Sequence, residues 1–390
     1  MGELQISKRA AGIKPSATLA ISAKAKELAK AGKNVIDLGA GEPDFETPTN
    51  IKMAAKKAID EGFTKYTTNT GIQELKKAVC EKLKKDNNLT YTEEQVIISN
   101  GAKQSLINTF LAILDEGDEV IIPKPSCVSF EEQVILCGAK PIFAETEHFK
   151  IKAEHIKNKI TNKTKAIILN SPCNPTGAVI ENEEVKKIAN LCVKHNIICV
   201  SDETYEKIIY DSKKNLSIAS LNKDIYEKTI TINTLSKSYS MTGWRIGYCA
   251  GSKQYIEAMS RIQGHTTSAP SSISQKAALE ALRGSQEAVE SMRKEFEERR
   301  DYIIKRLKNM PGIKCSKPQG AFYAFPDITG TKLGSREFCE KLLKEELVAI
   351  VPGEAFGEDR CVRISFAASK EKLRAGMDRL ERFCKKRLGK

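Results

Sequence analysis

Short apolar runs alternate with amphipathic stretches from residue 95 to residue 250. Several runs are apolar at nearly every position, which is typical of strands that are buried on both faces of a parallel sheet. The expected strands are residues 95–99, 119–122, 140–143, 166–170, 197–201, 229–233 and 245–250. The expected helices between them are residues 104–114, 129–136 and 183–195. Alternating strands and helices predict an α/β fold with a mainly parallel, seven-stranded sheet that helices cover on both faces.

A different pattern begins after residue 252. Residues 272–283 and 286–308 have helical periodicity, and the second of these helices is long and highly charged, as a helix that connects two domains can be. The remaining expected elements are strands at 321–325, 349–351 and 362–366 and helices at 335–342 and 369–385. We therefore expect a second, smaller α+β unit that begins near residue 290, whereas periodicity alone does not place the N-terminal residues.

The composition excludes several classes of protein. The 390 residues suffice for two domains, and the net charge of +13 comes from 63 basic and 50 acidic residues that are mixed along the chain. Because there is no arginine-rich arm, we expect no nucleic-acid partner. The 11 cysteines and four histidines show no metal-ligand spacing, so we expect reduced thiols in a cytoplasmic protein without a metal. No apolar stretch is long enough to span a membrane, so we expect no membrane partner.

Polar residues follow four of the expected strands, at the edge of an open α/β sheet where ligands bind. One strand is followed by Gly101, Ala102 and Lys103 at a helix start, where free backbone N–H groups can bind a phosphate. From this segment alone, an ordinary strand-to-helix turn is the simpler interpretation. Another strand is followed by residues 170–177, which include the amide side chain of Asn174.

The two remaining strand ends carry an acid and an amine. Asp202 follows an apolar run, so we expect its carboxylate to be buried and to need a cation, such as the protonated ring nitrogen of a cofactor. An N-cap for a helical segment at 203–205 explains Asp202 equally well. Lys237 lies near the hydroxyl of Thr234, with Arg245 eight residues on. A lysine that is partly desolvated beside a cation has a lowered pKa and becomes a nucleophilic amine.

Together these segments resemble the pyridoxal-phosphate-dependent aminotransferases of fold type I, and in particular the aspartate aminotransferase branch of class I, subgroup beta. The matching stretches occur in the order that the family shows, and they are residues 14–18, 38–45, 65–66, 101–103, 170–177, 200–205, 236–237, 241–248, 320–323 and 362–365. The resemblance implies a large domain over 46–289 that binds pyridoxal 5'-phosphate. It also implies a small domain made of 1–45 and 290–390.

The resemblance implies a set of residues around this cofactor. Lys237 would hold it covalently and, once released, would move the substrate α-proton as acid and base. Asp202 would keep the ring nitrogen protonated, and Tyr205 would donate a hydrogen bond to the ring 3-oxygen. The other residues implied around the cofactor are Gly101, Ala102, Lys103, Cys127, Asn174, Thr234, Arg245 and, from the neighbouring subunit of a homodimer, Tyr66. The homodimer would thus share its active sites.

The same resemblance implies substrate contacts. Arg363 would bind the substrate α-carboxylate in a bidentate pair, with help from Asn174 and the backbone of Gly41. The other implied substrate contacts are Lys103 and Thr18, toward the distal carboxylate of a dicarboxylic substrate, Lys14, in relatives that also accept prephenate, and Cys127.

One position departs from the family pattern. Ser126 and Cys127 stand where the family usually has a tryptophan or tyrosine that stacks on the cofactor ring. The stacking partner is either lost, which would loosen the ring and enlarge the pocket, or supplied by a neighbour such as Phe130.

The activity implied by the resemblance is transfer of an amino group from an L-amino acid, with L-aspartate favoured, to 2-oxoglutarate in a ping-pong cycle. One alternative is a broader aminotransferase that accepts prephenate, alanine or aromatic amino acids. Another is a pyridoxal-phosphate-dependent β-eliminating lyase. The lyase would release pyruvate and ammonia without an oxo-acid acceptor, so dependence on the acceptor separates the two reactions.

Overall fold

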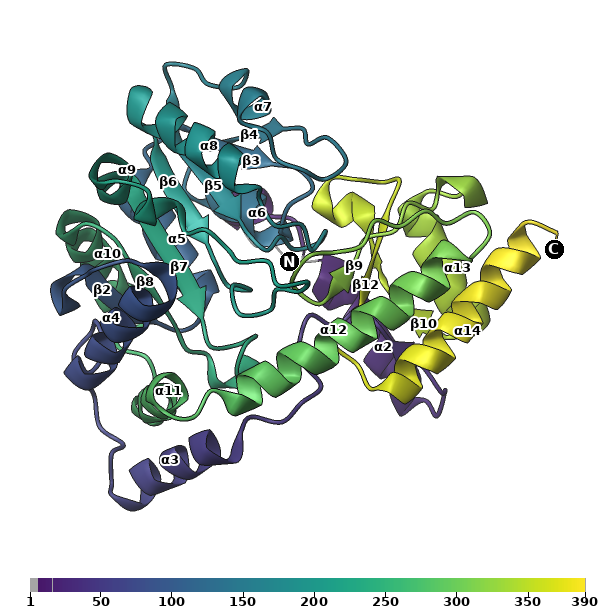
Figure 1. Ribbon diagram of the computed structural model, residues 1–390, viewed down its shortest axis with the longest axis horizontal. Coiled ribbons are helices and arrows are strands. Elements are labelled where there is room, and N and C mark those ends of the chain that lie inside the picture. The colour runs from purple at the N-terminus through teal and green to yellow at the C-terminus, as the bar shows by residue number, and fades with distance from the viewer. Residues whose placement is uncertain (1–5, 16, 390) are drawn as a thin grey trace, which may run out of the picture.

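A seven-stranded sheet forms the centre of the larger part of the molecule (Figure 1). The structure is a computed structural model that describes residues 6–15 and 17–389, with the backbone alone for residues 17–19. In spatial order the strands are β2 (Val96–Ser99), β8 (Gly247–Ala250), β7 (Thr229–Thr234), β6 (Ile198–Asp202), β5 (Thr164–Asn170), β3 (Glu119–Pro123) and β4 (Lys140–Ala144). Strand β8 is antiparallel to both of its neighbours, and the other pairs are parallel. The predicted mainly parallel, seven-stranded sheet is therefore confirmed.

Different helices cover the two faces of the sheet, because side chains alternate along each strand. The helices of this part are α3 (Thr49–Asp60), α4 (Gln73–Asn87), α5 (Ala102–Ile113), α6 (Val128–Leu136), α7 (Ala153–Lys157), α8 (Asn182–Lys194), α9 (Lys223–Lys228), α10 (Lys253–Thr266) and α11 (Ser272–Arg283). In β2, Ile97 packs with α5, α6 and α10, whereas Val96 and Ile98 pack with α3, α4 and α11. In β3, Ile121 packs with α7, α8 and α9 on the face opposite to Ile122. The candidate functional site lies at the carboxyl ends of the strands.

The second unit begins with α12, a long helix that starts near α11 and continues into the C-terminal part (Figure 1). Its helices are α12 (Glu287–Lys308), α13 (Ser335–Glu346) and α14 (Lys370–Arg387), and its strands are β9 (Tyr323–Ala324), β10 (Val348–Ala349), β11 (Val351–Pro352) and β12 (Val362–Ser365). Strands β11, β12 and β9 form an antiparallel sheet. The predicted connecting helix and α+β elements are present, with one exception among the strands.

That exception is residues 349–351, which the sequence predicts to be one strand. The structure divides this run between β10 and β11, which belong to different sheets on either side of Ile350. Ile350 is 1% exposed, and its neighbours are also buried. A run that is apolar at every position has no periodicity to reveal where the chain changes sheet.

The N-terminal segment, which periodicity does not place, joins the C-terminal unit. It contains α1 (Lys8–Ala11), α2 (Ala17–Lys30) and β1 (Ile36–Asp37). Strand β1 pairs in parallel with β10, so that Ile36 lies beside Val348. Ile36 and Leu38 share one buried cluster with apolar residues of α12, α13 and α14. Within the described residues, no helix is both long enough and apolar enough to cross a membrane.

Candidate active site

Three strand ends meet at one end of the candidate site. Gly247, the first residue of β8, is the register partner of both Ser99 in β2 and Thr234 in β7. A Cβ atom on Gly247 would come within 2.7 Å of the Ala102 backbone nitrogen, so the start of α5 packs directly on this point. The first-turn N–H groups of α5, which have no partner within the helix, therefore lie near the end of β7.

Arg245 adds a positive charge to the same place. It has a left-handed backbone with φ 51°, and its guanidinium donates to the carbonyl oxygens of Thr242 at 2.9 Å and Asn100 at 3.4 Å. A Cβ atom on Gly101, whose φ is +84°, would meet Arg245 Nη2 at 2.7 Å. The helix start, the Thr234 hydroxyl and this guanidinium form what we call the phosphate cradle, made of Gly101, Ala102, Thr234 and Arg245. Its charge suits a phosphate group.

Lys237 follows β7 and presents a buried amine. Its Nζ donates a hydrogen bond to the backbone oxygen of Gly41 at 2.6 Å. Burial, followed by the positive charges of Arg363 and Arg245, lowers the pKa of Lys237 to about 8. A substantial fraction of this amine is therefore neutral, and thus nucleophilic, at mildly alkaline pH.

Asp202 is the last residue of β6 and is buried. Burial raises the pKa of its carboxyl, and hydrogen bonds from Thr204 and the charge of Lys237 oppose this shift. Its Oδ1 accepts a hydrogen bond from the Thr204 backbone nitrogen at 3.1 Å. Residues 204–207 form a turn, so the alternative that Asp202 caps a helix at 203–205 is wrong. A carboxylate in this setting is stabilised by a nearby cation such as a protonated ring nitrogen.

Arg363, Tyr205 and Tyr323 form a second polar group from both parts of the molecule. The hydroxyls of Tyr205 and Tyr323 are 2.8 Å apart and share a hydrogen bond. Arg363 stacks on Tyr323, with its Cζ 4.4 Å from the ring centroid. It donates to Asn174 Oδ1 at 3.0 Å and to the Gly39 oxygen at 2.7 Å. Its Nε is buried and has no partner among the described residues, so a donor remains for a ligand carboxylate.

Gly41 connects the two groups. Its backbone oxygen accepts the hydrogen bond from Lys237, and a Cβ atom on Gly41 would lie 2.8 Å from the Tyr323 hydroxyl oxygen. Only glycine fits at this close approach without displacing Tyr323. The structure thus brings together the predicted residues Lys237, Gly41, Arg363, Asn174 and Tyr205.

Three other predicted residues, Lys103, Tyr66 and Lys14, are not part of this group. Lys103 is exposed in the first turn of α5, and Tyr66 is 97% exposed in the loop after α3. The side chain of Lys14 is largely exposed and pairs with Glu131 in α6 at 3.2 Å. The side chain of Thr18 lies outside the described residues.

Cys127 stands just before α6 and is partly buried. Burial raises the pKa of its thiol, and the charge of Asp202 adds to this shift. Phe130 is 1% exposed and packs into the core between the sheet and α5. A cavity of about 30 Å³, lined by Ser126 and Phe130 among others, lies beside this position. This is room for about one water molecule.

Tyr323 is a residue of the site that the sequence does not reveal. It lies within the matching stretch 320–323, but no local pattern assigns it a role. The antiparallel pairing of β9 with β12, in which Tyr323 lies opposite Ser365, brings it beside Arg363. Such a residue can be found only once the pairing of these strands is known.

This set of groups defines an enzyme that binds a phosphorylated aromatic cofactor. The phosphate cradle, the buried amine of Lys237 and the buried carboxylate of Asp202 come from the ends of adjacent strands. The three groups suit, respectively, the phosphate, the aldehyde and the ring nitrogen of pyridoxal 5'-phosphate. The free donor of Arg363 then remains for a substrate carboxylate.

Comparisons with known proteins agree with this description. The pattern of the family described as "Aminotransferase class I and II" matches residues 33–380. The chain is 49% identical to an aspartate aminotransferase of Bacillus subtilis, over 98% of this chain and 100% of that protein. It is 45% identical to an aspartate/prephenate aminotransferase of Cereibacter sphaeroides, over 96% of this chain and 97% of that protein. Among solved structures, it is similar to the aspartate aminotransferase from Thermus thermophilus with maleate, with a TM-score of 0.94 and 41% identity over 97% of this chain and all of that one.

The chain belongs to the aminotransferase class I and II family and is a pyridoxal-phosphate-dependent aminotransferase of fold type I.

Proposed function

We propose that this enzyme transfers the amino group of L-aspartate to 2-oxoglutarate in a ping-pong cycle. The observation that supports this proposal is that the amine of Lys237 and the guanidinium of Arg363 both lie close to Gly41, because a nucleophilic amine and a group suited to a carboxylate could then meet one substrate. The names of the relatives from Bacillus subtilis and Thermus thermophilus support aspartate as the donor.

The cofactor is held by the strand ends. Gly101 and Ala102 bind the phosphate through backbone N–H groups, and Thr234 and Arg245 bind it through their side chains. Asp202 holds a proton on the ring nitrogen. When bound, pyridoxal phosphate supplies an electron-withdrawing ring that makes the α-proton of the amino acid easier to remove.

The remaining residues bind the substrate and move its α-proton. Arg363 binds the α-carboxylate, and Asn174 orients the guanidinium through its hydrogen bond. Lys237 Nζ, once neutral and free, takes the proton from the substrate Cα and later returns a proton. Tyr205 donates a hydrogen bond to the ring 3-oxygen.

The distal part of the substrate is assigned to other side chains. We assign the distal carboxylate to Lys103 and to Thr18. Lys14 is assigned to the binding of prephenate, a substrate that is named for the relative from Cereibacter sphaeroides. In the structure Lys14 is held by Glu131, so this role requires Lys14 to leave that carboxylate.

A broader aminotransferase is the second candidate. It is favoured by Cys127, which stands in place of a stacking aromatic residue. With less bulk beside the cofactor ring, the pocket would accept larger apolar substrates. The β-eliminating lyase has no such observation in its favour, and it is the third outcome of the test below.

Two further properties belong to the same proposal. A homodimer would give Tyr66, which is 97% exposed in one chain, a place in the neighbouring active site beside the phosphate. The shared cluster of Ile36, Leu38 and the C-terminal helices supports a small domain of 1–45 and 290–390 beside a large domain of 46–289. The free cysteines among the described residues support a cytoplasmic location.

The test is a screen of half-reactions. The purified holoenzyme is mixed with single amino acids, and the loss of the visible absorption of the lysine-bound cofactor is ranked by rate. Aspartate and glutamate should rank first, and amino transfer should require 2-oxoglutarate or oxaloacetate. Equal rates with alanine or phenylalanine would favour the broader enzyme, and release of pyruvate and ammonia without an acceptor would favour the lyase.

A further inference from the structure

Two short paired segments lie next to Tyr205 and Tyr323 in the chain. Residues 208–210 and 319–321 run antiparallel, joined by backbone hydrogen bonds of 2.9 and 3.0 Å and by an isolated β-bridge. Tyr205 lies three residues before the first segment, and Tyr323 lies two residues after the second. The hydroxyls of Tyr205 and Tyr323 are hydrogen-bonded to each other. Because each tyrosine is close in the chain to one of the paired segments, the pairing helps to set the distance between the two hydroxyls.

Arg300 of α12 connects the outer ends of both segments. Its side chain is fully buried. It donates to both carboxylate oxygens of Asp211, at 2.8 and 3.0 Å, and to the carbonyl oxygen of Pro318 at 3.3 Å. Its Cζ lies 4.5 Å from the ring centroid of Tyr210, whose hydroxyl donates to the Ala321 oxygen. One guanidinium therefore contacts the residue after the first segment and the residue before the second.

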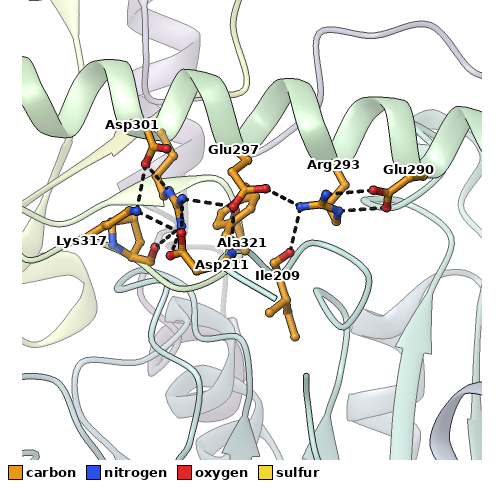
Figure 2. Close-up of polar contacts among 11 residues, drawn as sticks. Ile209, Asp211, Glu290, Arg293, Glu297, Asp301, Lys317 and Ala321 are labelled. Carbon is orange, nitrogen blue, oxygen red and sulfur yellow. Dashed lines mark hydrogen bonds and ion pairs between the residues drawn. The ribbon is translucent and has the colours of Figure 1, made fainter. Parts of the chain in front are cut away.

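The surroundings of this guanidinium hold the first segment on α12 (Figure 2). Glu297 accepts a hydrogen bond from the Asp211 backbone nitrogen at 2.8 Å. Arg293 donates to the Ile209 oxygen at 3.4 Å and pairs with Glu297 at 2.7 Å. Lys317 pairs with Asp211 at 3.0 Å. The segment is thus fixed to the helix by both backbone and charged contacts.

The ion pair of Arg300 with Asp211 is a modest source of stability, because the Asp211 side chain is 44% exposed and water weakens the attraction. A bidentate arginine pair does, however, fix one relative geometry, because its donors form a rigid fork. The geometry fixed here is that of the two segments that lie next to Tyr205 and Tyr323 in the chain.

We propose that Arg300 is a positioning residue that aligns Tyr205 and Tyr323 for the cofactor and the substrate. This inference rests on the proposed function, because that function assigns Tyr205 to the ring 3-oxygen. Arg300 acts through the paired segments and not by contact with cofactor or substrate. Loss of Arg300 should therefore shift the pH midpoint of the visible absorption change of the bound cofactor, and it should also lower the stability of the fold.

The experiment compares three variants of the holoenzyme. Arg300→Gln removes the fork, and Tyr210→Phe removes only the hydroxyl that donates to Ala321, with little change in volume. Arg306→Gln is the matched control, because Arg306 lies on the same helix and pairs with Asp378 at 2.7 Å and Glu381 at 2.9 Å, away from the two segments. The pH midpoint of the visible absorption change of the bound cofactor, kcat/KM and Tm are measured for each.

Arg300→Gln should raise the absorption midpoint by roughly half a pH unit and lower kcat/KM about tenfold, as expected when one hydrogen bond to the cofactor is weakened. Tyr210→Phe should shift both in the same direction by less. Arg306→Gln should lower Tm while leaving the midpoint and kcat/KM unchanged.

Arg300→Gln with a lowered Tm and an unchanged midpoint would show a purely structural role and overturn the inference. If that variant does not fold, an unchanged midpoint in Tyr210→Phe overturns it instead. The wild-type enzyme is assayed first for amino transfer. Its failure there would refute the proposed function, whereas an active wild type with unaltered variants would refute the positioning role alone.

Discussion

The lowered pKa of Lys237 predicts how fast the cofactor-free enzyme couples to an aldehyde. Burial and the charges of Arg363 and Arg245 lower this pKa from 10.5 to about 8. At pH 7 the neutral fraction of the amine is then roughly 300-fold larger than for an ordinary exposed lysine. Two changes alter the neutral fraction of this amine in the cofactor-free enzyme. The first is a change of pH, and the second is the variant Arg363→Met, which removes one of the nearby positive charges.

The assay uses pyridoxal without its phosphate, so that the phosphate cradle does not contribute to binding. The rate of the absorption change on coupling is measured from pH 6 to pH 10. It should rise with pH and level off around a midpoint near pH 8, because only the neutral amine attacks the aldehyde. Arg363→Met should move this midpoint upward, whereas Arg306→Met, a charge far from Lys237, should not move it. A wild-type midpoint at pH 10 or above would refute the reasoning, since the amine would then behave as one in water.

Three further predictions concern other parts of the site. Lys103→Leu should raise KM for aspartate at least about tenfold more than KM for alanine, because a charged hydrogen bond to the distal carboxylate is lost. Equal increases in KM for both substrates in steady-state assays would show that another residue binds that carboxylate. Cys127→Trp should lower the Kd of pyridoxal phosphate, measured by fluorescence titration, by restoring a stacking ring worth about 1 kcal/mol; an unchanged Kd would show that position 127 does not face the ring. Glu203 is buried, and burial raises its pKa from 4.5 to about 7. The unfolded chain therefore loses this proton first, and the free energy of unfolding should fall as the pH rises from 4.5 to 7. Urea unfolding of wild type and Glu203→Gln at pH 5 and pH 8 gives the free energy of unfolding at each pH. The variant should show a smaller fall between the two pH values than wild type. An equal fall in both proteins would contradict the raised pKa of Glu203.

The central sheet could be predicted because its strands are short apolar runs with clear ends. Each residue of β2, for example, is buried on one face or the other, so an unbroken apolar run is sufficient evidence for a strand there. The run 348–352 is equally apolar, yet it divides between two sheets at Ile350. Burial on every side conceals such a change of partner, and only the paired strands reveal it.

The strand-end residues of the site could also be predicted, because parallel strands bring their carboxyl ends to one edge. Asp202, Thr234 and Gly101 are examples. Tyr323 and the Gly41 oxygen could not be found in that way. The Gly41 oxygen reaches Lys237, and Tyr323 reaches Arg363, through pairings between distant parts of the chain, and nothing in their local sequence records those pairings.

The pairing of β1 with β10 has a consequence for biosynthesis. Gly41 follows a strand whose partner is Val348–Ala349, so the first residues of the site have no fixed place until residue 349 has left the ribosome. Arg363 emerges later still. A nascent chain that is shorter than this lacks both the partner strand of β1 and the guanidinium beside Gly41, so the complete site has to wait for the C-terminal unit.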